Sequence, residues 1–82
     1  MYRLNVRIDN SIVSYLFPTI SDVYQYVLDS VATDGDRKYY RDLCGLELED
    51  VKSRSEDSKN AILRNVFENV VLVEQIDNTP RI

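Results

Sequence analysis

The regular alternation of apolar and polar side chains at the start of the chain constrains the fold more than any other sequence feature. Every second residue from Tyr2 to Ile8 is apolar, and the residues between are polar. This pattern predicts a strand with one buried and one solvated face. A second stretch, residues 12–17, is rich in β-branched and aromatic residues and stops at a proline. With Asn10-Ser11 as a two-residue turn, residues 2–17 are expected to form a β-hairpin.

A helical repeat follows the hairpin. Thr19 is placed to cap this helix, with Asp22 three residues later in the position of a capping-box partner. The helix is expected to end near Thr33, with Gly35 as its stop. The apolar stripe that predicts it has helical spacing and consists of Ile20, Val23, Tyr24, Val27, Leu28 and Val31.

The second half of the chain is less regular. Residues 37–44 suggest a short helix, capped by Asp36 and stopped by Gly45. Residues 46–49 alternate apolar and acidic side chains, which fits either a small strand or a loop.

A further helix is expected from about Asp57 to about Asn69, with Ser55, Asp57 or Ser58 as its cap. Residues 70–76 are then predicted to form a third strand, and residues 77–82 a frayed tail.

These elements predict an α+β fold with the helices packed on one face of a small sheet. The order is a β-hairpin, two main helices with a short helix between them, and a C-terminal strand. At 82 residues the chain is expected to be a single domain, residues 1–82. The order of the strands in the sheet stays open, because a third strand that follows a helix can pair with either edge of the hairpin.

The second face of this sheet carries more apolar side chains than a solvated face needs. The second strand is apolar on both sides, and the third strand opens with four apolar residues, 70–73. A large exposed apolar surface on a small protein usually marks an interface. We therefore expect a partner or a second copy of the chain to cover this face or the edge of the third strand. The alternative is that residues 46–51 fold over it. The candidate self-association residues are Ile12, Leu16, Val71 and Val73.

Composition argues against several classes of function. The formal net charge is −4, whereas a protein that binds the phosphate backbone needs a concentrated basic face. No run of residues approaches the length of a membrane span, and no signal-peptide pattern follows Met1. The lone cysteine, Cys44, cannot form an internal disulfide, so a cytoplasmic location is expected.

The side chains available for catalysis are few. The chain has no histidine, which removes the Ser-His and Cys-His pairs. Cys44 is interpreted as a small core residue. The sequence Asp34-Gly35-Asp36 lacks the further ligands of a calcium-binding loop, and no glycine-rich phosphate loop is present. We expect no enzymatic activity, no metal site and no cofactor.

Charged and aromatic residues suggest binding surfaces instead. Residues 19–36 contain four aspartates and no basic residue, so the first helix has an acidic outer face. Residues 37–41 interleave basic residues with two tyrosines. Tyrosine and arginine are favoured anchors of protein interfaces. The candidate protein-binding residues are Asp22, Tyr26 and Asp29 on the first helix, and Arg37, Tyr39, Tyr40 and Arg41 beyond it.

In size and acidity the chain resembles phage-encoded host-takeover or anti-defence proteins, bacteriocin immunity proteins and antitoxins. It is therefore expected to be a protein-binding module that inhibits or titrates another macromolecule, acting in the host cytoplasm if phage-encoded. An acidic surface suits a partner with a basic one. One alternative is a homodimer or a structural subunit of a larger assembly. Another is nucleic-acid binding through residues 37–41, which have the pattern of a stacking surface, or imitation of DNA by the acidic helix.

Overall fold

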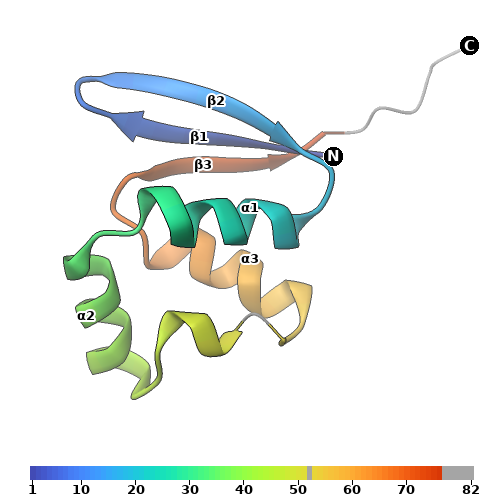
Figure 1. Ribbon diagram of the computed structural model, residues 1–82. Helices are drawn as coiled ribbons and strands as arrows, with labels where there is room; N and C mark the ends of the chain where they lie inside the picture. The colour runs from blue at the N-terminus through green and yellow to red at the C-terminus, as the bar shows by residue number, and fades with distance from the viewer. Residues whose placement is uncertain (52, 77–82) are drawn as a thin grey trace, which may run out of the picture.

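The computed structural model describes residues 1–51 and 53–76, and Figure 1 shows their arrangement. A three-stranded antiparallel sheet lies against a layer of helices, which confirms the α+β class. The expected frayed tail falls outside the described residues. The elements in chain order are β1 (Tyr2–Ile8), β2 (Ser11–Phe17), α1 (Ile20–Tyr26), the π-helix η1 (Val27–Val31), α2 (Asp34–Cys44), the 3-10 helix η2 (Leu48–Val51), α3 (Glu56–Asn65) and β3 (Val70–Gln75).

The predicted hairpin is present, but its turn lies one residue earlier than expected. Ile8 pairs with Ser11, so the turn consists of Asp9 and Asn10. The backbone of Asp9 has a φ of 55°, in a region that aspartate tolerates better than serine or β-branched residues. The expectation of an Asn10-Ser11 turn was therefore wrong, because the position with positive φ falls on the aspartate.

The strand order is β2-β1-β3, so the first strand is central and β3 completes the sheet on its other side. The pairing of β3 with β1 contains a β-bulge. Asn5 pairs with Leu72 while Val6 pairs with Val70, which leaves Val71 as the extra residue.

The first helix begins where it was predicted, since the Thr19 side chain accepts a hydrogen bond from the backbone of Asp22. It continues as η1 and ends at Ala32. Gly35 does not stop it. The next helix has already begun at Asp34 with Thr33 as its cap, so the prediction that Asp36 caps this helix was also wrong.

Thr33 and Asp36 instead form a capping box. The Thr33 Oγ1 accepts from the backbone N–H of Asp36, and the Asp36 carboxylate accepts from the backbone N–H of Thr33, each over 3.0 Å. At the other end Gly45 has a φ of 68° and donates its N–H to the carbonyl of Arg41. The predicted stop at Gly45 is confirmed.

The later elements depart from the sequence pattern in two places. Residues 48–51 form a 3-10 helix rather than a strand or loop. The last helix is capped by Ser55 and ends at Asn65, four residues before the predicted end. Phe67 then enters the core and Val70 pairs with Val6, so the chain leaves the helix early in order to reach β1.

The core lies between the sheet and the helices. Figure 1 shows α1 and α3 beside the sheet, and α2 and η2 on the side of these helices away from it. Inside, the hydroxyl of Tyr24 donates to the carbonyl of Leu48, and the ammonium of buried Lys59 donates to Ser21 Oγ over 3.0 Å, tying α3 to α1. The buried apolar residues are Leu4, Val6, Ile20, Val23, Tyr24, Val27, Leu28, Tyr40, Leu48, Val51, Leu63 and Phe67.

Candidate functional site

One face of the sheet is covered by the helices and the other is not. On β1 the side chains of Leu4 and Val6 are fully buried, and since side chains alternate along a strand, the residues between them point to the opposite face. The strand register extends that face across the sheet. We call it the open face; its residues are Arg3, Asn5 and Arg7 on β1, Ile12, Ser14 and Leu16 on β2, and Leu72 and Glu74 on β3.

The open face exposes large apolar side chains. Ile12, Leu16 and Leu72, together with Val71 of the adjoining bulge, are between 47% and 58% exposed. Three of these were named from the sequence as candidates for self-association. Leu72 was not, because an unbroken apolar run hides the alternation that would reveal it.

The fourth candidate for self-association, Val73, was wrongly placed. It pairs with Leu4 on the covered face and packs against the core. The bulge at Val71 shifts the register of β3 so that Val70 and Val73 both turn inward. Ile8, at the tip of the hairpin, was expected under the helices but is exposed.

Residues 46–51 do not cover the open face, contrary to the alternative considered above. Leu48 and Val51 are each 1% exposed and belong to the core on the helical side. Figure 1 shows η2 separated from the sheet by the other helices. No other described element lies on the open face.

A polar network runs through the middle of the open face. The Ser14 hydroxyl donates to Asn5 Oδ1, and Asn5 Nδ2 donates to Glu74 Oε1 over 3.3 Å. Arg3 and Arg7 lie on either side of Asn5 and are exposed. The open face therefore has large apolar side chains on both edge strands, beside Ser14 and Glu74, and two arginines on the central strand.

The predicted acidic surface on the first helix is only partly formed. Asp22 and Asp29 are exposed, and Gln25 Nε2 donates to the Asp29 carboxylate. Tyr26 points toward the sheet instead, with ring centroids 5.1 Å from Tyr15 and 5.4 Å from Phe17. A hydrogen bond with Tyr15 is the main reason that the pKa of Tyr26 is raised. The placement of Tyr26 on the outer face was therefore wrong.

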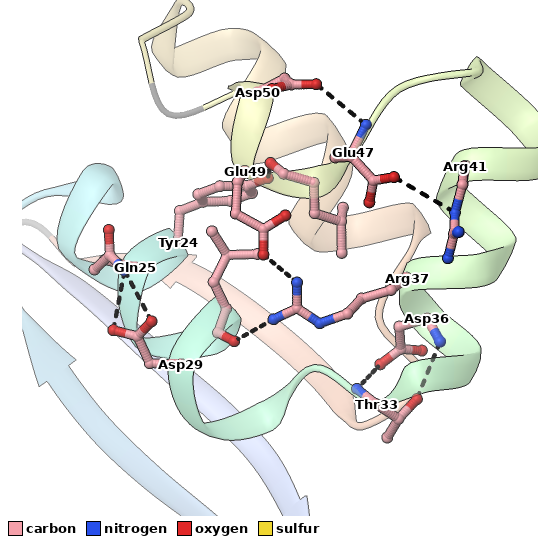
Figure 2. A network of polar contacts seen from close by, with 12 residues as sticks. Tyr24, Gln25, Asp29, Thr33, Asp36, Arg37, Arg41, Glu47, Glu49 and Asp50 are labelled. Atoms are coloured by element: carbon pink, nitrogen blue, oxygen red, sulfur yellow. Dashed lines mark hydrogen bonds and ion pairs between the residues drawn. The ribbon is translucent and has the colours of Figure 1, made fainter.

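The predicted basic and aromatic cluster is not a single surface. The Arg37 guanidinium pairs with Glu49 and donates to the Leu28 carbonyl over 2.9 Å, linking three segments (Figure 2). On the protein surface, Arg41 Nε lies 3.7 Å from Glu47 Oε1.

The two tyrosines of that cluster point in different directions. Tyr40 is 4% exposed and belongs to the core, whereas Tyr39 is 52% exposed. Burial raises the pKa of Tyr40. The prediction that Tyr40 is a protein-binding residue was wrong, because its ring is buried in the core together with residues of other elements.

Tyr39 lines a hollow of about 350 Å³ where the start of α2 meets the end of α3. The Asp36 carboxylate on its wall already accepts from Thr33 and from the backbone N–H of Glu68. The hollow is assembled from segments about thirty residues apart, so no local sequence signal reveals it. The remaining residues around it are Gly35, Asn65, Val66 and Glu68.

The cysteine and the acidic side chains that could serve catalysis or metal binding are scattered over the described part of the chain. Cys44 is exposed rather than buried in the core as expected. Among residues 1–51 and 53–76 no three histidine, cysteine or acidic side chains are gathered as metal ligands. No helix in the same residues has the length and apolar character to cross a membrane.

Comparisons with family models, with curated proteins and with solved structures find no match to this chain.

Proposed function

We propose that this protein is a protein-binding module that docks on its partner through the open face of the sheet and thereby inhibits or titrates it. The observation that supports this most directly is the half exposure of Ile12, Leu16 and Leu72 on a face that no described element covers. Isolated apolar residues on a surface are normal, but several on one sheet face are typical of an interaction site.

The composition of the open face indicates the chemistry of the partner. An apolar patch on the partner would cover the two edges, and carboxylates would lie opposite Arg3 and Arg7. Arginines at the centre of an interface act as anchors when paired with carboxylates, because the guanidinium binds them in a fixed geometry. The net charge of −4 predicts a partner with a basic surface instead. Such a partner would pair with Asp22 and Asp29 on the helices, and not with the open face.

The basic cluster gives less support to the nucleic-acid alternative. Arg37 and Arg41 each lie beside a glutamate, and Tyr40 is buried. A stacking surface needs unpaired cations beside exposed rings, and of the two tyrosines only Tyr39 presents its ring.

The test is capture of partners from a nuclease-treated lysate of the native host, read by quantitative mass spectrometry. Wild-type protein is compared with Leu72→Asp on the open face and with Leu43→Asp. Leu43 is a matched control because it is a leucine 64% exposed on α2, away from the sheet. Circular dichroism checks that both variants fold.

We expect one protein to be enriched about equally by wild type and Leu43→Asp and to be lost with Leu72→Asp. Loss of a single buried leucine contact, with a charge placed there, should weaken binding by more than ~1 kcal/mol. Retention of the partner by Leu72→Asp, or its equal loss with Leu43→Asp, would show that the open face is not the binding site.

A further inference from the structure

The outer edge of β2 presents a defined set of backbone groups. The N–H of Arg7 donates to Asn69 over 2.8 Å, so the odd-numbered residues of β1 direct their backbone toward β3 and the even-numbered ones toward β2. In an antiparallel pair the opposed residues exchange their hydrogen bonds. Val6 directs its backbone toward β2 and lies opposite Val13, so Val13 is hydrogen-bonded to β1. Alternate residues of a strand direct their backbone to opposite sides. The N–H and C=O groups of Ile12, Ser14 and Leu16 therefore point away from the sheet.

This edge lacks the devices that usually protect a sheet edge. Natural edge strands carry charges, prolines or bulges that prevent pairing with another strand. The other edge strand, β3, has the bulge at Val71 and a glutamate at position 74. In contrast, β2 from Ser11 to Phe17 contains no charged residue, no proline and no glycine, and it forms its seven pairs with β1 without a bulge.

We infer that the β2 edge pairs with β2 of a second copy of this chain, antiparallel and centred on Ser14, to form a continuous six-stranded sheet. Only a register that opposes outward-directed residues can form the hydrogen bonds. Of these registers, only the one centred on Ser14 pairs Ile12, Ser14 and Leu16 with outward-directed residues of the second copy. Any shift leaves at least one of them unpaired.

The side chains of β2 complement one another in this register. On the open face Ile12 lies opposite Leu16 of the second copy, and Ser14 lies opposite Ser14 of the second copy. On the covered face Val13 lies opposite Tyr15 of the second copy. Aliphatic pairs and aromatic pairs with β-branched residues stabilise neighbouring strands, and no charge meets another. This match favours a second copy over a foreign strand as the occupant.

The inference goes beyond the proposed function and does not rest on it. A two-fold axis at Ser14, perpendicular to the sheet, places the helices of both copies on the same side. The two open faces then join into one surface, with Ile12 and Leu16 of both copies at its centre. The pair of copies can therefore still dock a partner.

The first test is the solution mass of the intact protein by analytical ultracentrifugation, from micromolar to millimolar concentration. Wild type is compared with Leu16→Lys, which places a charge on the pairing edge, and with Leu72→Lys, a matched change on the far strand. We expect wild type and Leu72→Lys to reach twice the monomer mass of 9.6 kDa. The dissociation constant of Leu16→Lys should rise about tenfold or more.

A second measurement needs no variant. Amide hydrogen exchange of wild type should slow with concentration at Ile12, Ser14 and Leu16, and not at Val73 and Gln75, whose N–H groups point outward along the other edge. Wild type that stays monomeric throughout, a dimer that survives Leu16→Lys, or exchange at these amides that is independent of concentration would overturn the inference. None of these outcomes changes the comparison of wild type with Leu72→Asp in the capture experiment. Failure of the dimer inference is therefore distinct from failure of the proposed function.

Discussion

The backbone N–H of Glu68 donates a hydrogen bond of 3.1 Å to Oδ1 of Asp36, which joins the start of α2 to the segment between α3 and β3. The other carboxylate oxygen accepts from Thr33 over 3.0 Å. One buried side chain thus caps a helix and also positions the chain just before it enters the sheet.

Replacement of Asp36 by asparagine is therefore expected to lower the free energy of unfolding by about 2 kcal/mol. The amide nitrogen of asparagine cannot accept a hydrogen bond, so one backbone N–H loses its partner. Urea unfolding followed by circular dichroism measures the change. Asp34→Asn, an exposed change in the same helical turn, is the control and should cost well under 1 kcal/mol. Equal effects of the two substitutions would contradict the linking role of Asp36.

The two glycines should respond in opposite directions to the same substitution. Gly45 has a φ of 68°, so Gly45→Ala is expected to destabilise the protein by about 1 kcal/mol. Gly35 lies inside α2, and an added Cβ would meet Thr33 Oγ1 at an ordinary 3.5 Å. Because alanine favours a helix, Gly35→Ala should stabilise by about 0.5 kcal/mol. Thermal melting of the two variants measures the direction of each change in stability. A loss of stability in Gly35→Ala would contradict the early start of α2.

The adjacent tyrosines should also differ. Tyr40→Ala removes a core ring and should cost about 3 kcal/mol or more, whereas Tyr39→Ala should change stability by no more than about 0.5 kcal/mol. Urea unfolding of the two variants tests this directly. Comparable losses would mean that Tyr39 is also part of the core.

Alkaline pH should unfold the protein through its buried phenols. Burial raises the pKa of Tyr24, as does the nearby charge of Tyr40 and Glu49. A phenol with a higher pKa in the folded state stays protonated while the unfolded chain ionises. Its stabilising contribution is therefore complete below about pH 10 and is lost as pH rises above it.

Unfolding by urea across this pH range, with tyrosinate absorbance as a second probe, measures the loss. Tyr24→Phe should weaken the pH dependence. It should also cost about 1 kcal/mol at neutral pH, because the hydrogen bond to the Leu48 carbonyl is removed. A pH dependence identical to wild type would show that Tyr24 does not control alkaline unfolding.

The elements that could be predicted from sequence are those with a local cause. The hairpin follows from an alternation of period two and the first helix from an apolar stripe capped by Thr19, and both are present. The start of α2 was missed because Thr33 caps this helix almost where the first one ends. A glycine two residues later looks like a stop in the sequence, although it lies within the next helix.

The binding surface was predictable in outline but not in detail. The apolar excess of β2 identifies the open face, because that excess is visible along one strand. The roles of Tyr26 and Tyr40 depend on contacts with Phe17 and with the core around Leu48. Such contacts join residues on different elements, and helical periodicity does not show them. The bulge at Val71, which turns Val73 inward, is likewise a product of pairing with β1.

The pairing of β1 with β3 has a consequence for how the chain folds. The hairpin can close as soon as it is made, because its strands are joined by a two-residue turn. The other edge of β1 stays open until Val70–Gln75 have been synthesised. Long-range contacts of this kind are slow to form, so we expect the hairpin to stay exposed along both edges until β3 pairs with β1. The interval before β3 docks is therefore the stage of biosynthesis at which this protein is most exposed to aggregation.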